Sequence, residues 1–334
     1  MVYLFLEDME PVHIPSTETI EFKPAFIERY SLLTDFEEFK KYSLSFLRRS
    51  IRVNTLLTTV KETTKSIKAK GWRLEQIPWC KEGFWIDNPE RRDVGNLLEF
   101  QVGKIYVQEA ASMIPPLVLN PKPGEMVLDM CASPGSKTTQ MAAMMKNTGL
   151  LVANDYKGLR LQSLGINVQR CGLTNVVITL QHGHRFVDFQ FDKILVDAPC
   201  SGTGTIRKSL KTIRMWNPLM ITKLAQQQKL LIEAAFRNLK PGGEMVYSTC
   251  SVEPEENEGV VDSLLKKHPD AVIVPTVLKG LKTSPAILEF NGAVYGLSIK
   301  NTMRLWPQDN DTEGFFIAKI KKIRKRETKS IKDD

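Results

Sequence analysis

The fold is decided by the stretch GEMVLDMCASPGSKTTQMAAMMKNTGLLVAND, which runs from Gly124 to Asp155. Val127–Met130 is a short apolar run, residues 136–146 have helical spacing, and Leu150–Asn154 is a second apolar run. A strand, a tight turn, a helix and a second strand in this order are typical of a parallel sheet with crossover helices. Ligands of such sheets bind beyond the carboxyl ends of the strands, so residues that follow each strand are candidate site residues.

The same alternation continues along the chain to about residue 320. Asn217-Pro218 is typical of a helix start, and Lys240-Pro241-Gly242-Gly243 is expected to end that helix. Residues 103–320 are therefore predicted to form an α/β domain with a doubly wound, mostly parallel sheet. Its further predicted elements are strands over Asn175–Leu180, Lys193–Val196, Glu244–Ser248 and Gly314–Ile320, and helices over residues 157–170, 218–239 and 255–267.

The first hundred residues predict a separate, small N-terminal α/β domain over residues 1–102. Residues 24–47 have helical apolar spacing, and Thr59 and Glu62 have the spacing of a capping box at a helix start. That helix is expected to stop at Gly71, with strands over residues 50–56, 72–78 and 83–87. Two interpretations stay open here: a domain that only packs, and a domain that contacts RNA.

Composition excludes several classes of protein. The chain has 334 residues, 42% of them hydrophobic and 25% charged, with a formal net charge of +8. The basic surplus gathers in the tail over residues 321–334. No apolar run approaches the length of about 20 residues that a membrane span requires, and the start lacks the basic region of a secretory signal. Five widely spaced cysteines without a Cys-x-x-Cys pair predict free thiols, no metal site, and a cytoplasmic protein.

The turn after the first strand of the α/β domain is a candidate ligand loop. Cys131-Ala132-Ser133-Pro134-Gly135-Ser136-Lys137-Thr138 is rich in small residues, so its backbone N–H groups can approach a ligand closely. It matches neither the Gly-x-Gly-x-x-Gly fingerprint nor a phosphate-binding Walker loop. Asp155 follows the second strand, 20 residues after Gly135, and suits the two hydroxyls of a ribose, although it could also cap a helix. Together they favour an adenosine-type ligand without a pyrophosphate.

Two cysteines follow strands that should be neighbours in the sheet. Cys200 lies in Asp197-Ala198-Pro199-Cys200, and Cys250 in Ser248-Thr249-Cys250-Ser251. Both could be buried structural thiols, which is the common fate of free cysteine. A pair at one sheet edge instead suits chemistry at a pyrimidine, where one thiolate adds to carbon 6 and makes carbon 5 nucleophilic. The second thiol can then assist proton removal and release.

At these residues the sequence resembles the NSUN-type (Nop/Sun) RNA cytosine-5 methyltransferases. The resemblance covers most of the chain, and the joint occurrence of its motifs makes it specific. The matching segments are Arg52-Val53-Asn54-Thr55, Tyr106–Met113, Cys131–Thr138, Asp197–Gly204, Tyr247–Asn257 and Gly314-Phe315-Phe316. The resemblance implies a Rossmann-like class I methyltransferase domain that uses S-adenosylmethionine to methylate carbon 5 of a cytidine in RNA.

The resemblance also implies roles for single residues. Cys250 would be the nucleophile and Cys200 would aid product release, while Asp197 would bind the cytosine edge and Lys137 would line the pocket between base and cofactor. Residues implied to bind the cofactor are Cys131, Ala132, Ser133, Pro134, Gly135, Ser136, Lys137, Asp155, Arg160, His182 and Asp197. His182 stands where the family usually has an acidic residue near the adenine.

The expected partner is RNA, with tRNA as the leading substrate, ribosomal RNA as the second, no membrane, and a monomeric enzyme. The basic segment Arg207–Arg214, followed by Met215 and Trp216, is interpreted as an RNA contact with an aromatic stacking residue. The rival is a charged loop capped by a buried tryptophan. The alternatives in function are a non-catalytic RNA-binding scaffold and a DNA methyltransferase, which would need Cys200 but not Cys250.

Overall fold

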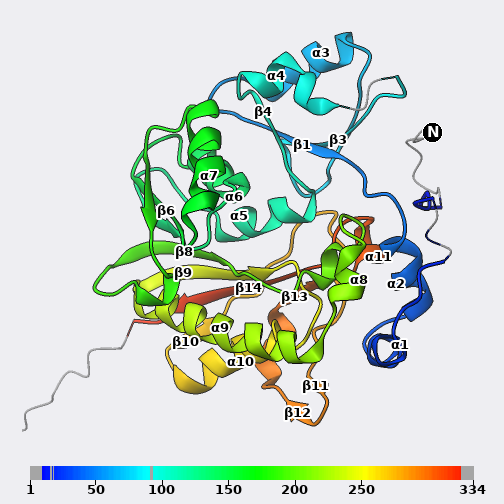
Figure 1. Ribbon diagram of the computed structural model, residues 1–334. Coiled ribbons are helices and arrows are strands. Elements are labelled where there is room, and N and C mark those ends of the chain that lie inside the picture. Colours follow the sequence, from blue (N-terminus) through cyan, green and yellow to red (C-terminus); the bar gives the residue numbers. More distant parts are fainter. Residues whose placement is uncertain (1–9, 16, 18, 91–92, 325–334) are drawn as a thin grey trace, which may run out of the picture.

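The computed structural model describes residues 10–324 except 16, 18, 91 and 92 (Figure 1). An eight-stranded sheet forms the large domain, and a four-stranded sheet lies at one side of it (Figure 1). Of the predicted basic tail only residues 321–324 are described, and the apolar start of the chain also lies outside the described residues. Within the described residues, no helix is both long and apolar enough to cross a membrane.

The large sheet has the strand order β10-β14-β9-β8-β5-β6-β7, with β13 paired to β14. The five strands from β9 to β7 are mutually parallel, whereas β14 runs antiparallel to β9. This arrangement confirms the predicted doubly wound, mostly parallel α/β fold. The strands are β5 (Met126–Asp129), β6 (Leu150–Asp155), β7 (Val176–Leu180), β8 (Phe191–Asp197), β9 (Leu239–Thr249), β10 (Ala271–Ile273), β13 (Met303–Leu305) and β14 (Phe315–Lys322).

Helices cover both faces of this sheet because its strands are apolar on both sides. Ile194 lies in the core under the helices α9 and α10, and the next residue, Leu195, lies in the opposite core under α5 and α6. This is why the buried strands are continuous apolar runs rather than alternating ones. The helices are α5 (Ile114–Leu119), α6 (Ser136–Met144), α7 (Gly158–Arg170), α8 (Lys211–Met215), α9 (Pro218–Arg237), α10 (Glu258–Lys267) and α11 (Pro307–Asn310), and a hairpin joins β11 (Glu289–Phe290) to β12 (Ala293–Val294).

The small domain is an antiparallel sheet of order β2-β3-β1-β4. The capping box of Thr59 and Glu62 is present at the start of its helix α3, as the sequence predicts. The last strand, β4, lies beyond residue 102 and still pairs with β1. The elements of this domain are β1 (Ser50–Val53), α3 (Val60–Ala69), β2 (Arg73–Gln76), β3 (Gly83–Asp87), α4 (Leu98–Gln101) and β4 (Ile105–Val107). The preceding helices α1 (Pro24–Ser31) and α2 (Phe36–Ser43) instead share a core with Trp216, Val252 and Trp306 of the large domain.

One helical pattern is divided in the structure, and one local prediction was wrong. The helical pattern over residues 24–47 is two helices, because Asp35 interrupts it and caps α2 by accepting hydrogen bonds from two backbone N–H groups. Residues 240–243 do not end α9, which stops at Arg237 with Asn238 as its C-cap. They belong instead to the start of β9, where a register shift against β8 accommodates them.

The two domains are joined by buried polar contacts. The Arg52 guanidinium donates to the Thr139 hydroxyl of α6 (2.9 Å) and to the Gln108 side chain (2.8 Å). The Asn54 amide donates to the carbonyls of Gly103 (3.0 Å) and Cys171 (2.9 Å). The segment Arg52-Val53-Asn54-Thr55, the first motif that resembles the family, therefore fixes the small domain against the large one near the start of α6.

Candidate active site

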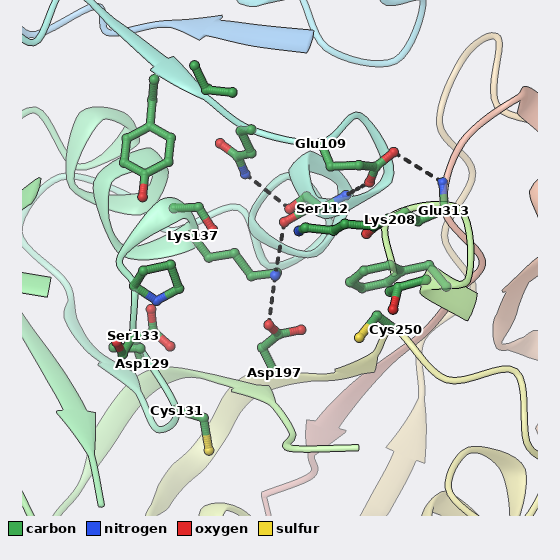
Figure 2. A pocket seen from close by; sticks show the side chains of 18 residues that line it. Glu109, Ser112, Asp129, Cys131, Ser133, Lys137, Asp197, Lys208, Cys250 and Glu313 are labelled. Atoms are coloured by element: carbon green, nitrogen blue, oxygen red, sulfur yellow. Dashed lines mark hydrogen bonds and ion pairs between the residues drawn. The ribbon is translucent and has the colours of Figure 1, made fainter. Parts of the chain in front are cut away.

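A cavity of about 460 Å³ opens at the carboxyl ends of β5, β8 and β9 (Figure 2). Figure 2 shows Lys137, Asp197, Cys250 and Glu109 around it, contributed by segments far apart in the chain. The position agrees with the general location of ligand sites in open α/β sheets. The lining residues are Tyr106, Val107, Gln108, Glu109, Ser112, Asp129, Cys131, Ala132, Ser133, Pro134, Ser136, Lys137, Asp197, Thr205, Lys208, Cys250, Glu313 and Phe315.

The two cysteines at the strand ends are in contact. The parallel register of β8 and β9 pairs Asp197 with Ser248, and the chain then places Cys200 Sγ 3.3 Å from Cys250 Sγ. Cys250 lines the cavity, whereas Cys200 is outside the set of lining residues. The hydrogen bond with Cys250, followed by burial, raises the pKa of the Cys200 thiol well above its usual value. Cys200 is therefore a protonated thiol at neutral pH, held beside a sulfur that faces the cavity.

A buried ion pair lies beside the thiols. Lys137 Nζ is 2.7 Å from Asp197 Oδ2 and also donates to the Ser112 hydroxyl (3.0 Å). The Ser248 hydroxyl donates to the other oxygen, Asp197 Oδ1 (2.8 Å). Burial alone would lower the pKa of Lys137, but the Asp197 carboxylate outweighs it and the pKa is raised. A permanent ammonium and a carboxylate thus face the cavity together.

The loop between β5 and α6 forms the other wall of the cavity. Gly135 has a φ of +107°, a conformation that disfavours any other residue, and it turns the chain into α6. No side chain caps this helix, so its first N–H groups are open to a ligand. Arg160 holds the loop from outside, since its guanidinium donates to the Ser133 carbonyl (2.7 Å) and its own carbonyl accepts from the Ser133 hydroxyl (2.7 Å).

Two buried carboxylates at this end of the sheet each have one oxygen without a hydrogen bond, although the Arg160 guanidinium lies 3.5 Å from Asp155 Oδ2. Asp129 Oδ1, at the end of β5, and Asp155 Oδ2, at the end of β6, accept no hydrogen bond from any described residue. Burial raises the pKa of Asp129 to about 7. Such atoms are costly unless a ligand supplies donors to them. Asp129 was not predicted as a site residue, although its place at the end of the first strand could have indicated it.

A second group that sequence reasoning missed is formed by Glu109, Glu313 and Lys208. Glu109 accepts hydrogen bonds from the backbone N–H groups of Ser112 (2.9 Å) and Glu313 (3.2 Å). Lys208 Nζ lies 3.9 Å from Glu313 Oε1. Burial, followed by the charge of Glu109, raises the pKa of Glu313 to about 7. Lys208 belongs to the basic segment that was interpreted as an RNA contact, whereas no local pattern assigned chemistry to Glu109 or Glu313.

Other predicted site residues lie at the periphery. Gly135, Asp155, Arg160 and Cys200 are outside the set of residues that line the cavity. Gly135, Arg160 and Cys200 each contact or adjoin a lining residue, whereas Asp155 is connected to the cavity wall through Arg160. His182 is exposed, and its ring lies 5.8 Å from that of Tyr156. Tyr156 directly follows Asp155, so His182 lies near the carboxyl ends of β6 and β7.

The predicted RNA-stacking role of Trp216 was wrong. Its side chain is only 4% exposed and packs edge-on against Phe26, with ring centroids 5.2 Å apart. Its indole N–H donates to Glu253 (3.1 Å). Arg207 is likewise buried and ion-paired with Asp311. The rival interpretation, a charged loop capped by a buried tryptophan, is the one that the structure supports, and only Lys208 of the segment lines the cavity.

Comparisons with known proteins agree with this architecture. A family profile described as 16S rRNA methyltransferase RsmB/F matches residues 116–321, and one for the N-terminal domain of RsmF matches residues 22–110. The chain belongs to the RsmB/F (Nop/Sun-type) family of RNA cytosine-5 methyltransferases. The resemblance seen in the sequence is thereby confirmed, and the protein is an enzyme whose methyl donor is S-adenosylmethionine.

Individual relatives extend this result. The chain is 48% identical to the tRNA (cytosine(49)-C(5))-methyltransferase of Pyrococcus abyssi over 301 residues, which cover 89% of this chain and 96% of that one. It is 44% identical to ribosomal RNA small subunit methyltransferase F of Shewanella sp. strain ANA-3 over 83% of this chain, and spans 57% of that relative's length.

Solved structures give the same fold. A methyltransferase homologue from Pyrococcus horikoshii is 36% identical with a TM-score of 0.76, covering 90% of this chain and 100% of that one. The NSun6 structure from the same organism has a TM-score of 0.80 at 24% identity, covering 91% of this chain and 99% of that one, and supports the fold alone.

The donor-free atoms of the RsmB/F site fit S-adenosylmethionine. The ligand brings two ribose hydroxyls, an ammonium and a carboxylate. Asp155 Oδ2 can accept from the hydroxyls, and Asp129 Oδ1 can accept from the ammonium. The open N–H groups at the start of α6 suit the carboxylate. The residues present therefore fit the ribose hydroxyls, the ammonium and the carboxylate of the cofactor.

Proposed function

We propose that this RsmB/F enzyme methylates carbon 5 of a cytidine in tRNA through a covalent adduct with Cys250, which Cys200 helps to release. One observation carries the proposal: the two thiols lie 3.3 Å apart at neighbouring strand ends, and Cys250 lines the cavity together with the Lys137–Asp197 pair. A reaction that uses two thiols and a fixed charge pair needs all of them within reach of one ring, and this cavity offers that.

The first half of the reaction uses Cys250 as the nucleophile. Its thiolate adds to carbon 6 of the cytosine, and the electron pair of the C5–C6 double bond becomes available at carbon 5. Asp197, held in place by Lys137 and the Ser248 hydroxyl, is positioned to accept from the exocyclic amine of the base. Bound S-adenosylmethionine supplies the electrophilic methyl group for carbon 5.

The second half restores the aromatic ring. The proton at carbon 5 leaves to water, its electron pair re-forms the C5–C6 double bond, and the C6–sulfur bond breaks. The Cys200 thiol, kept protonated by its raised pKa, is placed to protonate the departing sulfur. Without that proton the adduct would persist. The base must also leave its stack to enter the cavity, as with other enzymes that act on a base atom.

The Pyrococcus abyssi relative supports tRNA as the substrate. Its similarity to this chain extends over 96% of its length, and its name gives cytosine 49 of tRNA as the target. That position is the first to test here. Ribosomal RNA is the second candidate, because the family profiles and the Shewanella relatives are named for small-subunit rRNA.

Trapping of the adduct tests the proposal. We expect Cys200→Ala, mixed with S-adenosylmethionine and an unmodified tRNA transcript, to form a protein–RNA adduct that survives denaturing electrophoresis. The double variant Cys200→Ala/Cys250→Ala should form none. Cys171→Ala, which removes a buried thiol outside the cavity, is the matched control and should release its product normally.

The other outcomes are also informative. An adduct with a small-subunit rRNA fragment but not with tRNA would replace the substrate and keep the mechanism. Methylation of tRNA by the wild type together with the absence of any adduct in Cys200→Ala would overturn the two-thiol mechanism. An adduct that persists when Cys250 is also changed would assign the nucleophile to a residue other than Cys200 and Cys250.

A further inference from the structure

Glu313 carries a carboxylate oxygen for which the protein supplies no hydrogen-bond donor. Its side chain is 5% exposed and lines the cavity, and Oε1 accepts no hydrogen bond from any described residue. Lys208 Nζ stays 3.9 Å away, beyond hydrogen-bond distance. A buried carboxylate oxygen in this state is costly, so a ligand that brings a donor would relieve that cost.

The topology of the sheet places Glu313 on one particular side of Cys250. Strand β9, which ends before Cys250, lies between β8 and β14. Asp197 ends β8, and Glu313 stands two residues before β14. Two backbone hydrogen bonds through Gly204, to the Cys250 carbonyl and from the Gly314 N–H (both 2.9 Å), hold this junction together. Figure 2 shows Asp197 and Glu313 on opposite sides of Cys250.

The chemistry of the base then fixes which way it must lie. Carbon 5 has to face the methyl donor, whose predicted ligands lie at the ends of β5 and β6, on the β8 side of Cys250. Carbon 6 sits at the Cys250 sulfur. Nitrogen 1 is bonded to carbon 6 on the side away from carbon 5, and it carries the ribose. The ribose of the target nucleotide is thereby directed toward β14, where Glu313 lies.

We propose that Glu313 accepts a hydrogen bond from the 2′-hydroxyl of the target cytidine, and that Lys208 binds the adjoining phosphate. The two residues form a ribose–phosphate subsite that selects RNA over DNA at the methylated position. This inference rests on the function proposed above. It adds a specificity-determining contact to the cytosine contacts of Asp197 and Lys137.

The properties of the two side chains suit this subsite. Lys208 has a largely exposed side chain (69%), so its ammonium can reach a phosphate without losing a fixed protein partner. A 2′-hydroxyl is the one group by which a ribose differs from a deoxyribose, and it is a donor as well as an acceptor. A deoxyribose in the same place would leave Glu313 Oε1 unpaired, and a site built around a missing donor discriminates strongly.

A substitution in the RNA combined with one in the protein tests the proposal. The methylated cytidine is first mapped, and two synthetic RNAs are made that differ only in a ribose or a 2′-deoxyribose at that position. We expect wild-type kcat/KM at pH 8 to be about 10- to 100-fold higher for the ribose, the usual worth of a hydrogen bond to a charged group. In Glu313→Ala the ratio should fall to about 1, and in Glu313→Gln, which keeps a neutral acceptor, it should be intermediate.

The controls separate this subsite from folding and from the proposed function. Glu233→Ala removes a glutamate on α9 that pairs with Lys267 away from the cavity, and should keep the wild-type ratio. Binding of S-adenosylmethionine by calorimetry verifies that each variant is folded. A wild-type ratio near 1, or an unchanged ratio in both Glu313 variants, would overturn the inference while leaving the proposed function intact. Failure of the wild type to methylate any RNA would overturn the proposed function itself.

Discussion

Two ion pairs of almost equal length differ in their burial and in what surrounds them. Arg304 Nη2 lies 2.6 Å from Glu258 Oε2, and Lys137 Nζ lies 2.7 Å from Asp197 Oδ2. The first pair is closed: its side chains are 1% and 0% exposed, and Arg304 also donates to the Val252 carbonyl (2.7 Å). The second pair is open, because both of its side chains line the cavity.

The difference teaches how to separate architecture from function in this fold. Every polar atom of a closed pair is used within the protein, so such a pair fixes the positions of its elements, here α10 and β13. In an open pair, the two charges also act electrostatically on a ligand in the cavity. Length alone would not distinguish the two cases, whereas the partial exposure of Asp197 (27%) and its place in a cavity do. The closed pair should therefore affect stability, and the open pair should affect catalysis.

Breaking the closed pair should have the largest effect. Arg304→Met leaves the Glu258 carboxylate buried without its cation, and we expect the free energy of unfolding to fall by about 3–5 kcal/mol. Urea denaturation followed by circular dichroism measures this. The double variant Arg304→Met/Glu258→Leu removes both charges and should recover most of the loss. A single variant that loses less than about 1 kcal/mol would contradict the structural role of this pair.

Breaking the open pair should act on the reaction instead. Lys137→Met leaves Asp197 facing the cavity, where water can solvate it, so we expect a loss of stability below about 1 kcal/mol. We expect kcat/KM for RNA methylation to fall by about 100- to 1000-fold, because a preorganised charge at the reacting base is removed. The measurement is transfer of labelled methyl groups at saturating S-adenosylmethionine.

Lys193 is the matched control for Lys137. The two lysines are about equally buried, 9% and 8% exposed. Lys193 donates to the carbonyls of Leu119 (2.8 Å) and Asn120 (3.0 Å), away from the cavity. Lys193→Met should lose stability and keep its kcat/KM. Equal losses of activity in the two variants would mean that burial of the charge, and not its place in the cavity, decides the outcome.

Much of the fold could be predicted from the sequence because parallel strands buried on both faces are continuous apolar runs. The start of α3 and the strand β3 were predicted to the residue for the same kind of local reason. The break at Asp35 and the register shift at residues 240–243 could not be predicted so well. A capping residue within an apolar pattern and a Pro-Gly segment within a strand each resemble other local structures.

The candidate site likewise has residues that could be predicted from the sequence and residues that could not. The 131–137 loop and the two cysteines lie in contiguous motifs, and the sheet brings them together as expected from the strand order. The contact of Glu109 with Glu313 spans 204 residues and depends on how β14 enters the sheet. No local sequence pattern can indicate a contact between residues so far apart in the chain. The prediction for Trp216 was wrong for another reason. An aromatic residue among cations gives the same sequence pattern whether it stacks on RNA or is buried.

Glu109 and Glu313 extend the comparison of the two ion pairs to buried acids that are not paired with a buried cation. Burial and then the charge of Glu109 raise the pKa of Glu313 to about 7, with Lys208, Lys137 and Arg207 only partly opposing them. A carboxyl whose pKa is higher in the folded state than in the unfolded state binds its proton more tightly when folded. Its contribution to stability is therefore complete below about pH 4.5 and is lost as the pH rises through about 7.

We expect the free energy of unfolding of the wild type to fall by about 2 kcal/mol more than that of Glu313→Gln between pH 5 and pH 7. Urea denaturation at half-unit steps of pH measures the difference in unfolding free energy between the two proteins. Because Asp129 is present in both, its contribution cancels in this difference. Glu233→Gln is the control: the hydrogen bond from Lys267 lowers the pKa of Glu233, so this variant and the wild type should keep a constant difference over that range. Parallel pH profiles of the wild type and Glu313→Gln would show that Glu313 is already ionised at pH 5. Glu313 and Lys208 would then form a second ion pair in the cavity, and Glu313 would not be a protonated acid in the absence of a ligand.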